Sequence, residues 1–225
     1  MTTAVLAGST GLVGSHILTH LLTSPNTSSV HAYTRRSLPT ADPKAHALQS
    51  TDTSTWSSLF PQSAQLFLSA LGTTKASAGS VEKQRAIDLD LNYSLAQAAK
   101  SAGVDTYVLI SSQGANSASS FAYPKMKGEL EDKVKALGFK HCVILRPGLI
   151  VGDRQESRPA EAVARFLAGA LRKVSPGMVE GFAQDADVIA KAAVRAGELC
   201  LQGKRDEGVW MLGQAEIVKL AKEDN

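Results

Sequence analysis

The chain has 225 residues, of which 44% are hydrophobic and 20% are charged. That length is enough for one well-buried core and not obviously for two, and it suits a doubly wound α/β sheet of about six or seven strands. The net charge of +3 comes without a long basic run, so the composition gives no support to a nucleic-acid-binding protein.

The elements expected from the sequence alternate between short apolar runs and helical patterns along the whole chain. This alternation is typical of βαβ units that build a parallel sheet. The polar segment 37–60 is expected to hold only a weak strand and a short helix. In chain order we predict a strand at Ala4–Ala7, a helix at Leu12–Leu22, a strand at Val30–Thr34, the weak strand at Ala47–Gln49, the short helix at Thr55–Phe60, a strand at Leu66–Ala70, a helix at Ser80–Ala102 that is broken near its start, a strand at Tyr107–Ser111, a helix at Tyr123–Ala136, a strand at Cys142–Arg146, helices at Ala160–Arg172 and Asp187–Leu201, and a strand at Val209–Leu212.

The order of these elements predicts one Rossmann-type domain over residues 1–225, with helices on both faces of a single parallel sheet. No internal repeat or long linker divides the chain. Segment 148–180 has mixed polarity and several Gly and Pro residues, so we expect a small insert there on the substrate side. The helix near residue 187 would take Asp185 or Asp187 as its N-cap.

The N-terminus and the cysteines indicate a cytoplasmic protein. The first strand begins at about Thr3 and runs directly into a glycine-rich turn, which leaves no room for a targeting segment. No apolar run approaches the length of a membrane span, so we expect no integral membrane segment. Cys142 and Cys200 lie far apart in apolar surroundings without metal-ligand spacing, which predicts buried free thiols and no bound metal.

A glycine-rich turn, Gly8-Ser9-Thr10-Gly11-Leu12-Val13-Gly14, follows the first strand directly and opens the first helix. In this context the first glycine allows a sharp turn, the second allows backbone to approach a pyrophosphate, and the third allows close packing of helix on strand. The alternative is a glycine-rich turn without a ligand. The predicted cofactor-binding residues of this turn are Gly8, Ser9, Thr10, Gly11, Leu12 and Val13.

The end of the second strand favours NADP(H) over NAD(H). Many NAD-binding proteins place an acid there for the ribose 2′-hydroxyl, whereas an arginine suits the 2′-phosphate. This chain has no acid at that point and carries Arg35 and Arg36, whose permanent charges would attract a phosphate. The alternative is that both arginines are ordinary surface charges. Asp52 is the best candidate to meet the adenine edge.

A Tyr-x-x-x-Lys element provides the candidate catalytic pair. Tyr123 and Lys127 stand four residues apart on a predicted helix and therefore share a face. An ammonium group beside a phenol stabilises the phenolate, so the tyrosine could exchange a proton with a substrate oxygen while a nicotinamide moves the hydride. The preceding strand ends in Ser111 and Ser112, and we choose Ser112 as the hydroxyl that polarises the carbonyl, with Ser111 as the alternative.

The turn Arg146-Pro147-Gly148 follows the next strand, where backbone can border the nicotinamide. Together with the glycine turn, the double arginine, the serine pair and the Tyr-x-x-x-Lys element, it resembles the short-chain dehydrogenase/reductase superfamily over nearly the whole chain. Closer similarity, to the atypical Tat-interacting-protein oxidoreductases and to a fungal mitochondrial-outer-membrane protein family, lies in Leu71-Gly72-Thr73-Thr74, Ser111-Ser112-Gln113-Gly114-Ala115 and Asp153-Arg154-Gln155-Glu156-Ser157-Arg158-Pro159.

The resemblance implies a bound NADPH and a catalytic set of Ser112, Tyr123 and Lys127. It also implies that Leu71, Gly72 and Thr73 line the cofactor cleft, and the full set expected at the cofactor adds Ser111, Tyr123, Lys127, Pro147 and Gly148. Asp88 replaces an asparagine that supports the lysine in many relatives, which is a departure from the usual proton relay. Arg154, Glu156 and Arg158 would pin a loop over the cofactor, or an arginine of this string would face an acidic group. Peripheral attachment to the mitochondrial outer membrane is implied by the resemblance alone.

Two functions of different classes follow from this pattern. The first is an NADPH-dependent oxidoreductase that reduces a small carbonyl substrate, with a tyrosine as proton donor. The second is a non-catalytic protein that senses NADP(H) and presents a surface to a protein partner, which the fold alone does not exclude. The intact Ser/Tyr/Lys set favours the enzyme. The helix after Tyr123 favours a solvated face and a monomer rather than a dimer, because it carries Lys125, Lys127, Glu129, Glu131, Asp132, Lys133 and Lys135.

Overall fold

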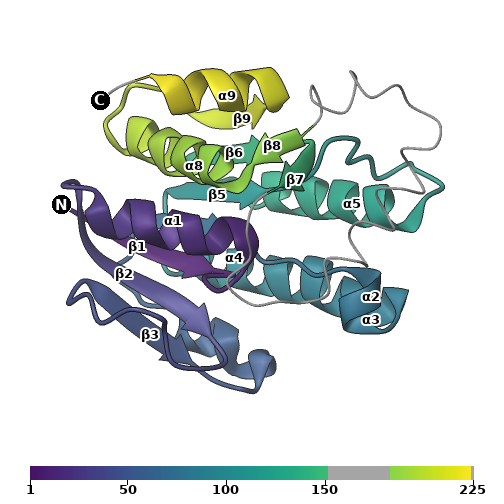
Figure 1. Cartoon of the computed structure of the whole chain (residues 1–225), viewed down its shortest axis with the longest axis horizontal. Helices are drawn as coiled ribbons and strands as arrows, with labels where there is room; N and C mark the ends of the chain where they lie inside the picture. The colour runs from purple at the N-terminus through teal and green to yellow at the C-terminus, as the bar shows by residue number, and fades with distance from the viewer. Residues whose placement is uncertain (152–182, 224–225) are drawn as a thin grey trace.

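A computed structural model of the chain describes residues 1–151 and 183–223 (Figure 1). Its main sheet has seven parallel strands in the order β3-β2-β1-β4-β5-β6-β9, which confirms the predicted doubly wound Rossmann fold. The strands are β1 (Thr2–Ala7), β2 (Thr27–Thr34), β3 (Ala45–Gln49), β4 (Leu66–Ser69), β5 (Thr106–Ile110), β6 (His141–Leu145) and β9 (Gly208–Leu212).

The central strands read as continuous apolar runs because both faces of the sheet are covered. Every residue of β4, β5 and β6 is buried, whereas the edge strand β3 is half-buried or exposed along its length. Strand order reverses between β1 and β4, since the chain proceeds from β1 to β3 on one side and from β4 to β9 on the other. In open α/β sheets, ligands bind outside the carboxyl ends of the strands at such a reversal.

Helices cover both faces of the sheet, as predicted. One face packs against α1 (Leu12–Thr23), α8 (Ala186–Leu201) and α9 (Gln214–Lys222). The other packs against the 3₁₀ helix η1 (Thr53–Leu59), α4 (Asn92–Ser101) and α5 (Ala122–Ala136). Figure 1 shows α1 and α8 side by side on one face of the sheet and α4 and α5 on the other.

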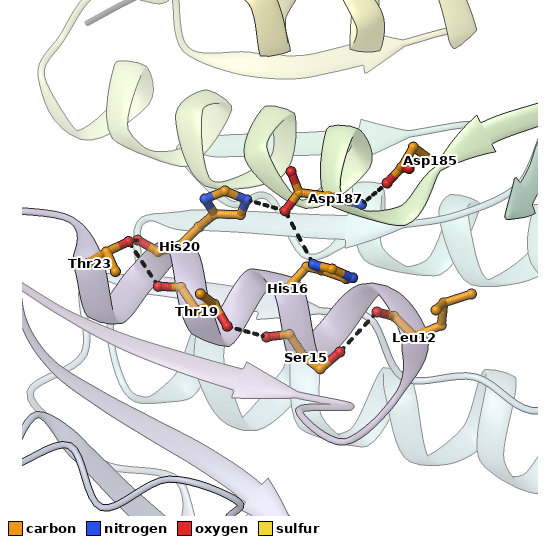
Figure 2. Close-up of polar contacts among 8 residues, drawn as sticks. All are labelled: Leu12, Ser15, His16, Thr19, His20, Thr23, Asp185 and Asp187. Atoms are coloured by element: carbon orange, nitrogen blue, oxygen red, sulfur yellow. Dashed lines mark hydrogen bonds and ion pairs between the residues drawn. The ribbon is translucent and has the colours of Figure 1, made fainter. Parts of the chain in front are cut away.

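A shared carboxylate joins α1 to α8 (Figure 2). One oxygen of Asp187 lies 2.8 Å from Nε2 of His20 and 3.2 Å from Nδ1 of His16, one helical turn away. The backbone N–H of Asp187 in turn donates to the side chain of Asp185 at 2.7 Å. Asp185 is therefore the N-cap of α8, and the alternative N-cap, Asp187, binds the neighbouring helix instead.

The predicted helix at Ser80–Ala102 is divided into several pieces. It consists of α3 (Val81–Arg85), a π-helical turn η2 (Ala86–Leu91) and α4, and a short α2 (Lys75–Ala78) precedes it. Ser80 caps α3 by accepting from the N–H of Lys83 at 3.1 Å. The break near the start was expected, but the π-helical turn was not. Such turns inside α-helices often occur at functional sites.

Two further differences concern the second half of the chain. The helix α9 and the small two-stranded sheet of β7 (Leu149–Val151) and β8 (Ala183–Asp185) were not predicted. The predicted helix at 160–172 and the polar string at 153–159 lie outside the described residues, as does most of the predicted insert. Within the described ranges, no helix is long and apolar enough to cross a membrane.

Both cysteines are buried and free, as predicted. Burial raises the pKa of the Cys142 thiol to about 12 and that of the Cys200 thiol to about 11. Both therefore stay protonated at neutral pH and act as apolar core groups.

Candidate functional site

The glycine turn after β1 is packed so tightly that only glycine fits at two of its positions. Gly8 has a positive φ of 86°, and a Cβ there would lie 2.6 Å from the carbonyl of Ala70 at the end of β4. A Cβ on Gly14 would lie 1.9 Å from the carbonyl oxygen of Gly8. The turn is therefore pressed against α1 and against the end of β4, at the reversal of strand order.

The N-terminus of α1 has no side-chain cap. Its N-cap is Gly11, which has no side chain to bond the first-turn amides, and the N–H of Gly11 itself donates to the oxygen of Gly8 at 2.9 Å. Uncapped amides and the positive end of a helix dipole suit a phosphate group. A dinucleotide pyrophosphate therefore fits the residues present.

The predicted residues of this turn differ in what they offer a ligand. Thr10 and Gly11 are exposed, and Leu12 is half-buried. Ser9 is 1% exposed, and its hydroxyl donates to the carbonyl oxygen of Tyr33 at 3.0 Å. Ser9 thus ties the turn to β2 and leaves only its backbone for a phosphate, while Val13 belongs to the apolar core.

The end of β2 presents the two arginines on the surface. Arg35 and Arg36 are both exposed, and the backbone around them is folded by Thr34, whose hydroxyl donates to the oxygen of Arg36 at 2.6 Å. Asp52 caps η1 through a 2.9 Å bond from the N–H of Ser54 and a 2.7 Å bond from its hydroxyl, and these bonds lower the pKa of the Asp52 carboxyl. Its contact with an adenine stays a prediction.

The segment after β4 is fixed by two buried polar groups. The N–H of Thr73 donates to Asp88 at 2.7 Å, and the amide of Asn92 donates to the carbonyl oxygen of Leu71 at 2.9 Å. The oxygen of that amide accepts from Ser69 at 2.5 Å. Sequence reasoning missed Asn92, although a polar residue on the apolar face of a helix was a usable signal. The Leu71–Thr73 backbone is thereby held beside Gly8.

Asp88 is a buried acid beside the segment that follows β4. It lies in the π-helical turn and is 2% exposed. Burial raises the pKa of its carboxyl to about 6, and the ammonium group of Lys127, the N–H of Thr73 and the side chain of Gln84 act in the opposite direction. The carboxyl group is therefore electrostatically coupled to the predicted catalytic lysine.

Tyr123 and Lys127 lie in the first part of α5, four residues apart as predicted. Lys127 is 3% exposed and its ammonium group donates to the carbonyl oxygen of Ile110 at 3.2 Å, whereas Tyr123 is 43% exposed. The loop after β5 comes very close to this helix, since a Cβ on Gly128 would lie 2.1 Å from the backbone nitrogen of Ser117. The helix is therefore locked to the loop that carries the serines.

The structure distinguishes the two serines. Ser111 is 4% exposed and its hydroxyl donates to Glu131 at 2.5 Å. Ser112 is half-buried as a residue, and its hydroxyl makes one long, exposed hydrogen bond, to the oxygen of Gln113 at 3.3 Å. Ser112 is thus the hydroxyl more available to a substrate.

Not all charges on α5 are solvated, which corrects the sequence interpretation of that helix. Glu131 is 1% exposed, and Lys127 is also buried. Nε and Nη2 of Arg146, on one edge of the guanidinium, donate to the two carboxylate oxygens of Glu131, so the arginine of the Arg-Pro-Gly turn is paired within the protein. Pro147 accepts from the N–H of Gln113 at 2.8 Å. The N–H of Gly148 donates to Gln184 at 3.1 Å.

Comparison with known proteins places the chain among fungal relatives. Residues 48–173, more than half of the chain, match the family model described as HIM1. The chain is 54% identical to "Protein fmp52, mitochondrial" of Aspergillus fumigatus, with 97% of this chain and 98% of the relative covered. It is 46% identical to "Protein fmp-52, mitochondrial" of Neurospora crassa, with 99% of this chain and 96% of that protein covered.

Solved structures confirm the fold. "MoeE5 in complex with UDP-glucose and NAD" aligns with a TM-score of 0.69 at 18% identity, covering 97% of this chain and 80% of that chain. WbmH of Bordetella bronchiseptica in complex with NAD⁺ aligns with a TM-score of 0.68 at 17% identity, covering 94% and 75%. At such identities the likeness concerns the Rossmann fold alone, whereas the sequence matches show that the chain belongs to the HIM1 family, together with the fungal Fmp52 proteins.

Proposed function

We propose that the chain is an NADP(H)-dependent oxidoreductase of the short-chain dehydrogenase/reductase type, which reduces a small carbonyl substrate. The observation that carries the proposal is the position of Lys127. This lysine is buried at the carboxyl edge of the sheet, bonded to the end of β5, and placed one helical turn from a partly exposed tyrosine. An ordinary surface lysine would be solvated and would not be buried against the end of a strand.

The proposed cofactor residues surround the reversal of strand order. The uncapped amides at the start of α1 hold the pyrophosphate, and the backbone after β4 borders the cofactor. When bound, the nicotinamide supplies a hydride to the carbonyl carbon. The proposed set is Gly8, Ser9, Thr10, Gly11, Leu12, Val13, Arg35, Arg36, Leu71, Gly72, Thr73, Ser111, Tyr123, Lys127, Pro147 and Gly148, in which Ser9 and Ser111 contribute backbone groups because their hydroxyls are engaged.

The proposed proton chemistry belongs to three side chains. Ser112 donates a hydrogen bond to the carbonyl oxygen and polarises it, and the phenol of Tyr123 gives that oxygen its proton. The ammonium group of Lys127 stabilises the phenolate that remains. Partial exposure of Tyr123 agrees with this role, because a proton donor must reach a substrate that enters from solvent.

The preference for NADP(H) rests on the two exposed arginines at the end of β2. We expect calorimetric titration of cofactor-stripped protein to show tight binding of NADPH and weak binding of NADH. The double variant Arg35→Ala/Arg36→Ala should lose most of that preference, because the 2′-phosphate loses its counter-charges. Lys219→Ala/Lys222→Ala, on the distant helix α9, removes the same charge and should leave the preference intact. Failure of the wild-type protein to bind either nucleotide would refute the proposal.

Replacement of Tyr123 by phenylalanine separates an enzyme from a cofactor-sensing protein. We expect Tyr123→Phe to lower kcat for carbonyl reduction by about 10² to 10⁴ while NADPH affinity changes little, since only the proton donor is lost. Tyr93→Phe, on α4, is the matched control. Unchanged turnover in Tyr123→Phe would exclude the assigned proton donor. NADPH binding without turnover of any carbonyl would favour the sensing protein.

We further propose that the chain is located at mitochondria. The names of its relatives support this, and they do not specify a membrane. Peripheral contact with the outer membrane is the proposed arrangement. Fractionation with protease treatment of intact mitochondria tests it, because a peripheral outer-membrane protein is digested and is released by alkaline carbonate.

A further inference from the structure

A buried carboxylate below the proposed site is shared by three parts of the fold. Glu131 of α5 accepts from the hydroxyl of Ser111 at 2.5 Å and from Nε of Arg146 at 3.0 Å. Its second oxygen binds Nη2 of Arg146 and lies 3.7 Å from the ammonium group of Lys135. The side chain of Glu131 is 1% exposed, while that of Arg146 is 34% exposed. The Glu131 hydrogen bonds raise the pKa of the Arg146 guanidinium further.

Burial of this carboxylate does not follow from core packing. Removal of a carboxylate from water is costly, and an apolar side chain of similar volume is often at least as stabilising. A bidentate arginine pair, however, fixes direction as well as distance. A buried pair of this kind therefore fixes the relative position of the two segments that it joins, whereas a hydrophobic contact would allow them to shift against each other.

The three parts that Glu131 joins are those that carry the proposed chemistry. Ser111 directly follows β5 and precedes Ser112, Arg146 directly follows β6 and precedes Pro147, and Glu131 lies one helical turn beyond Lys127 on α5. The segments that follow β5 and β6 are joined by a backbone hydrogen bond, in which the N–H of Gln113 donates to the oxygen of Pro147 at 2.8 Å. This bond is sensitive to the distance between the two segments.

We propose that Glu131 is a positioning residue, whose carboxylate sets the spacing between the β5 end, the β6 end and the catalytic face of α5. The effect of this spacing on catalysis rests on the proposed function, whereas the effect of Glu131 on the spacing does not depend on it. The residue acts through Ser112, Lys127 and the Pro147 backbone and touches no substrate.

Glu131→Gln is the first test, because an amide places an N–H donor opposite the guanidinium and breaks the paired bonds while keeping the volume. Glu198→Gln is its matched control. Glu198 is also a buried glutamate, and it accepts from the hydroxyl of Ser24 at 2.6 Å, far from the site. If Glu131→Gln fails to fold, Ser111→Ala is a less disruptive test variant, because it deletes only the hydroxyl that donates to Glu131. Its matched control is Ser24→Ala, which deletes the hydroxyl that donates to Glu198.

Amide hydrogen exchange by NMR tests the spacing without any cofactor. We expect the N–H of Gln113 to exchange at least 10-fold faster in Glu131→Gln than in Glu198→Gln, after both rates are compared with the global unfolding of each variant. A smaller acceleration in the same direction is expected for Ser111→Ala, and Ser111→Thr, which keeps the hydroxyl, should restore the slow rate. Equal rates at Gln113 in the Glu131 and Glu198 variants would overturn the proposal.

NADPH binding and turnover test the consequence. In Glu131→Gln we expect kcat to fall about 10- to 100-fold with little change in the KM for NADPH, because small misplacement of reacting groups costs rate more than binding. The fluorescence of the bound nicotinamide should shift toward that of free NADPH. Lower stability with unchanged kcat and unchanged fluorescence would leave Glu131 a purely structural residue. If no variant and no wild-type protein binds NADPH, the proposed function fails, and the exchange rates still decide the positioning role.

Discussion

The buried carboxyl group of Asp88 makes the stability of this protein depend on pH. Its pKa is about 6 in the folded chain, against an ordinary value of 3.8, because burial disfavours the charged form. A group with a raised acid pKa binds more protons in the folded state than in the unfolded state between these two values. Stability contributed by the neutral carboxyl is therefore complete below pH 4 and is lost as the pH rises through 6.

The size of the effect follows from the two pKa values. Each pKa unit is worth about 1.4 kcal/mol, so the charged form of Asp88 costs roughly 3 kcal/mol of folding free energy above pH 7 and about half of that at pH 5. Asp88→Asn replaces the carboxyl by a neutral group of the same shape that still accepts the bond from Thr73. We expect the variant to be more stable than the wild-type protein by up to about 3 kcal/mol at pH 8 and equal to it near pH 4.

Urea unfolding of both proteins between pH 4 and pH 8 measures this difference directly. Asp90→Asn, an exposed carboxyl in the same π-helical turn, is the control and should show no such pH-dependent gain. A stability difference between Asp88→Asn and the wild-type protein that stays constant with pH would refute the argument. A loss of stability in Asp88→Asn at pH 8 would mean that the carboxylate is held by its partners more strongly than burial opposes it.

Two further predictions follow from the contacts of α1 and α8. Gly14→Ala should lower the free energy of unfolding by about 2 kcal/mol or more and abolish NADPH binding, because its Cβ would overlap the carbonyl oxygen of Gly8. Urea unfolding measures the first effect and calorimetry the second. The control variant Ser15→Ala should change neither stability nor NADPH binding. Asp185→Ala should lower the free energy of unfolding by about 1 kcal/mol through loss of the α8 N-cap. Asp187→Asn should lower it by less than about 1 kcal/mol, because the two histidine contacts of Asp187 are partly exposed. A lower urea midpoint for Asp187→Asn than for Asp185→Ala would contradict this assignment.

The elements predicted best are those with strong local signals. The glycine turn, the buried central strands and the Tyr-x-x-x-Lys helix were placed within a few residues of their observed bounds, because each combines a hydrophobic period with a distinct end. The helix α9, which follows the last predicted strand, was not predicted although its pattern is amphipathic. The strand β8 has three residues, which is too short for a periodic signal.

Several site contacts were beyond sequence reasoning because they join residues far apart in the chain. Neither the pairing of Glu131 with Arg146 nor that of Asn92 with Leu71 has a local pattern. The charged residues of α5 were therefore interpreted as one solvated face, because helical spacing says which residues share a face and not what the neighbouring loop covers. The loop after β5 lies against α5 at Gly128, and of the seven charged residues Lys127 and Glu131 are buried.

Three buried charged residues of this chain lie close to the proposed site, in an arrangement that stability alone does not explain, while Glu198 is buried far from it. Desolvation of each ion costs several kcal/mol before its partners offset it, so an apolar replacement would often be at least as stable. Natural proteins commonly keep destabilising buried charges at sites where the chemistry requires them. Here Asp88, Lys127 and Glu131 are all buried below the carboxyl ends of the central strands, in the part of a doubly wound sheet where ligands bind. That arrangement agrees with the proposed proton and hydride transfer, whereas a scaffold that serves only protein contacts gives no reason for the desolvation cost.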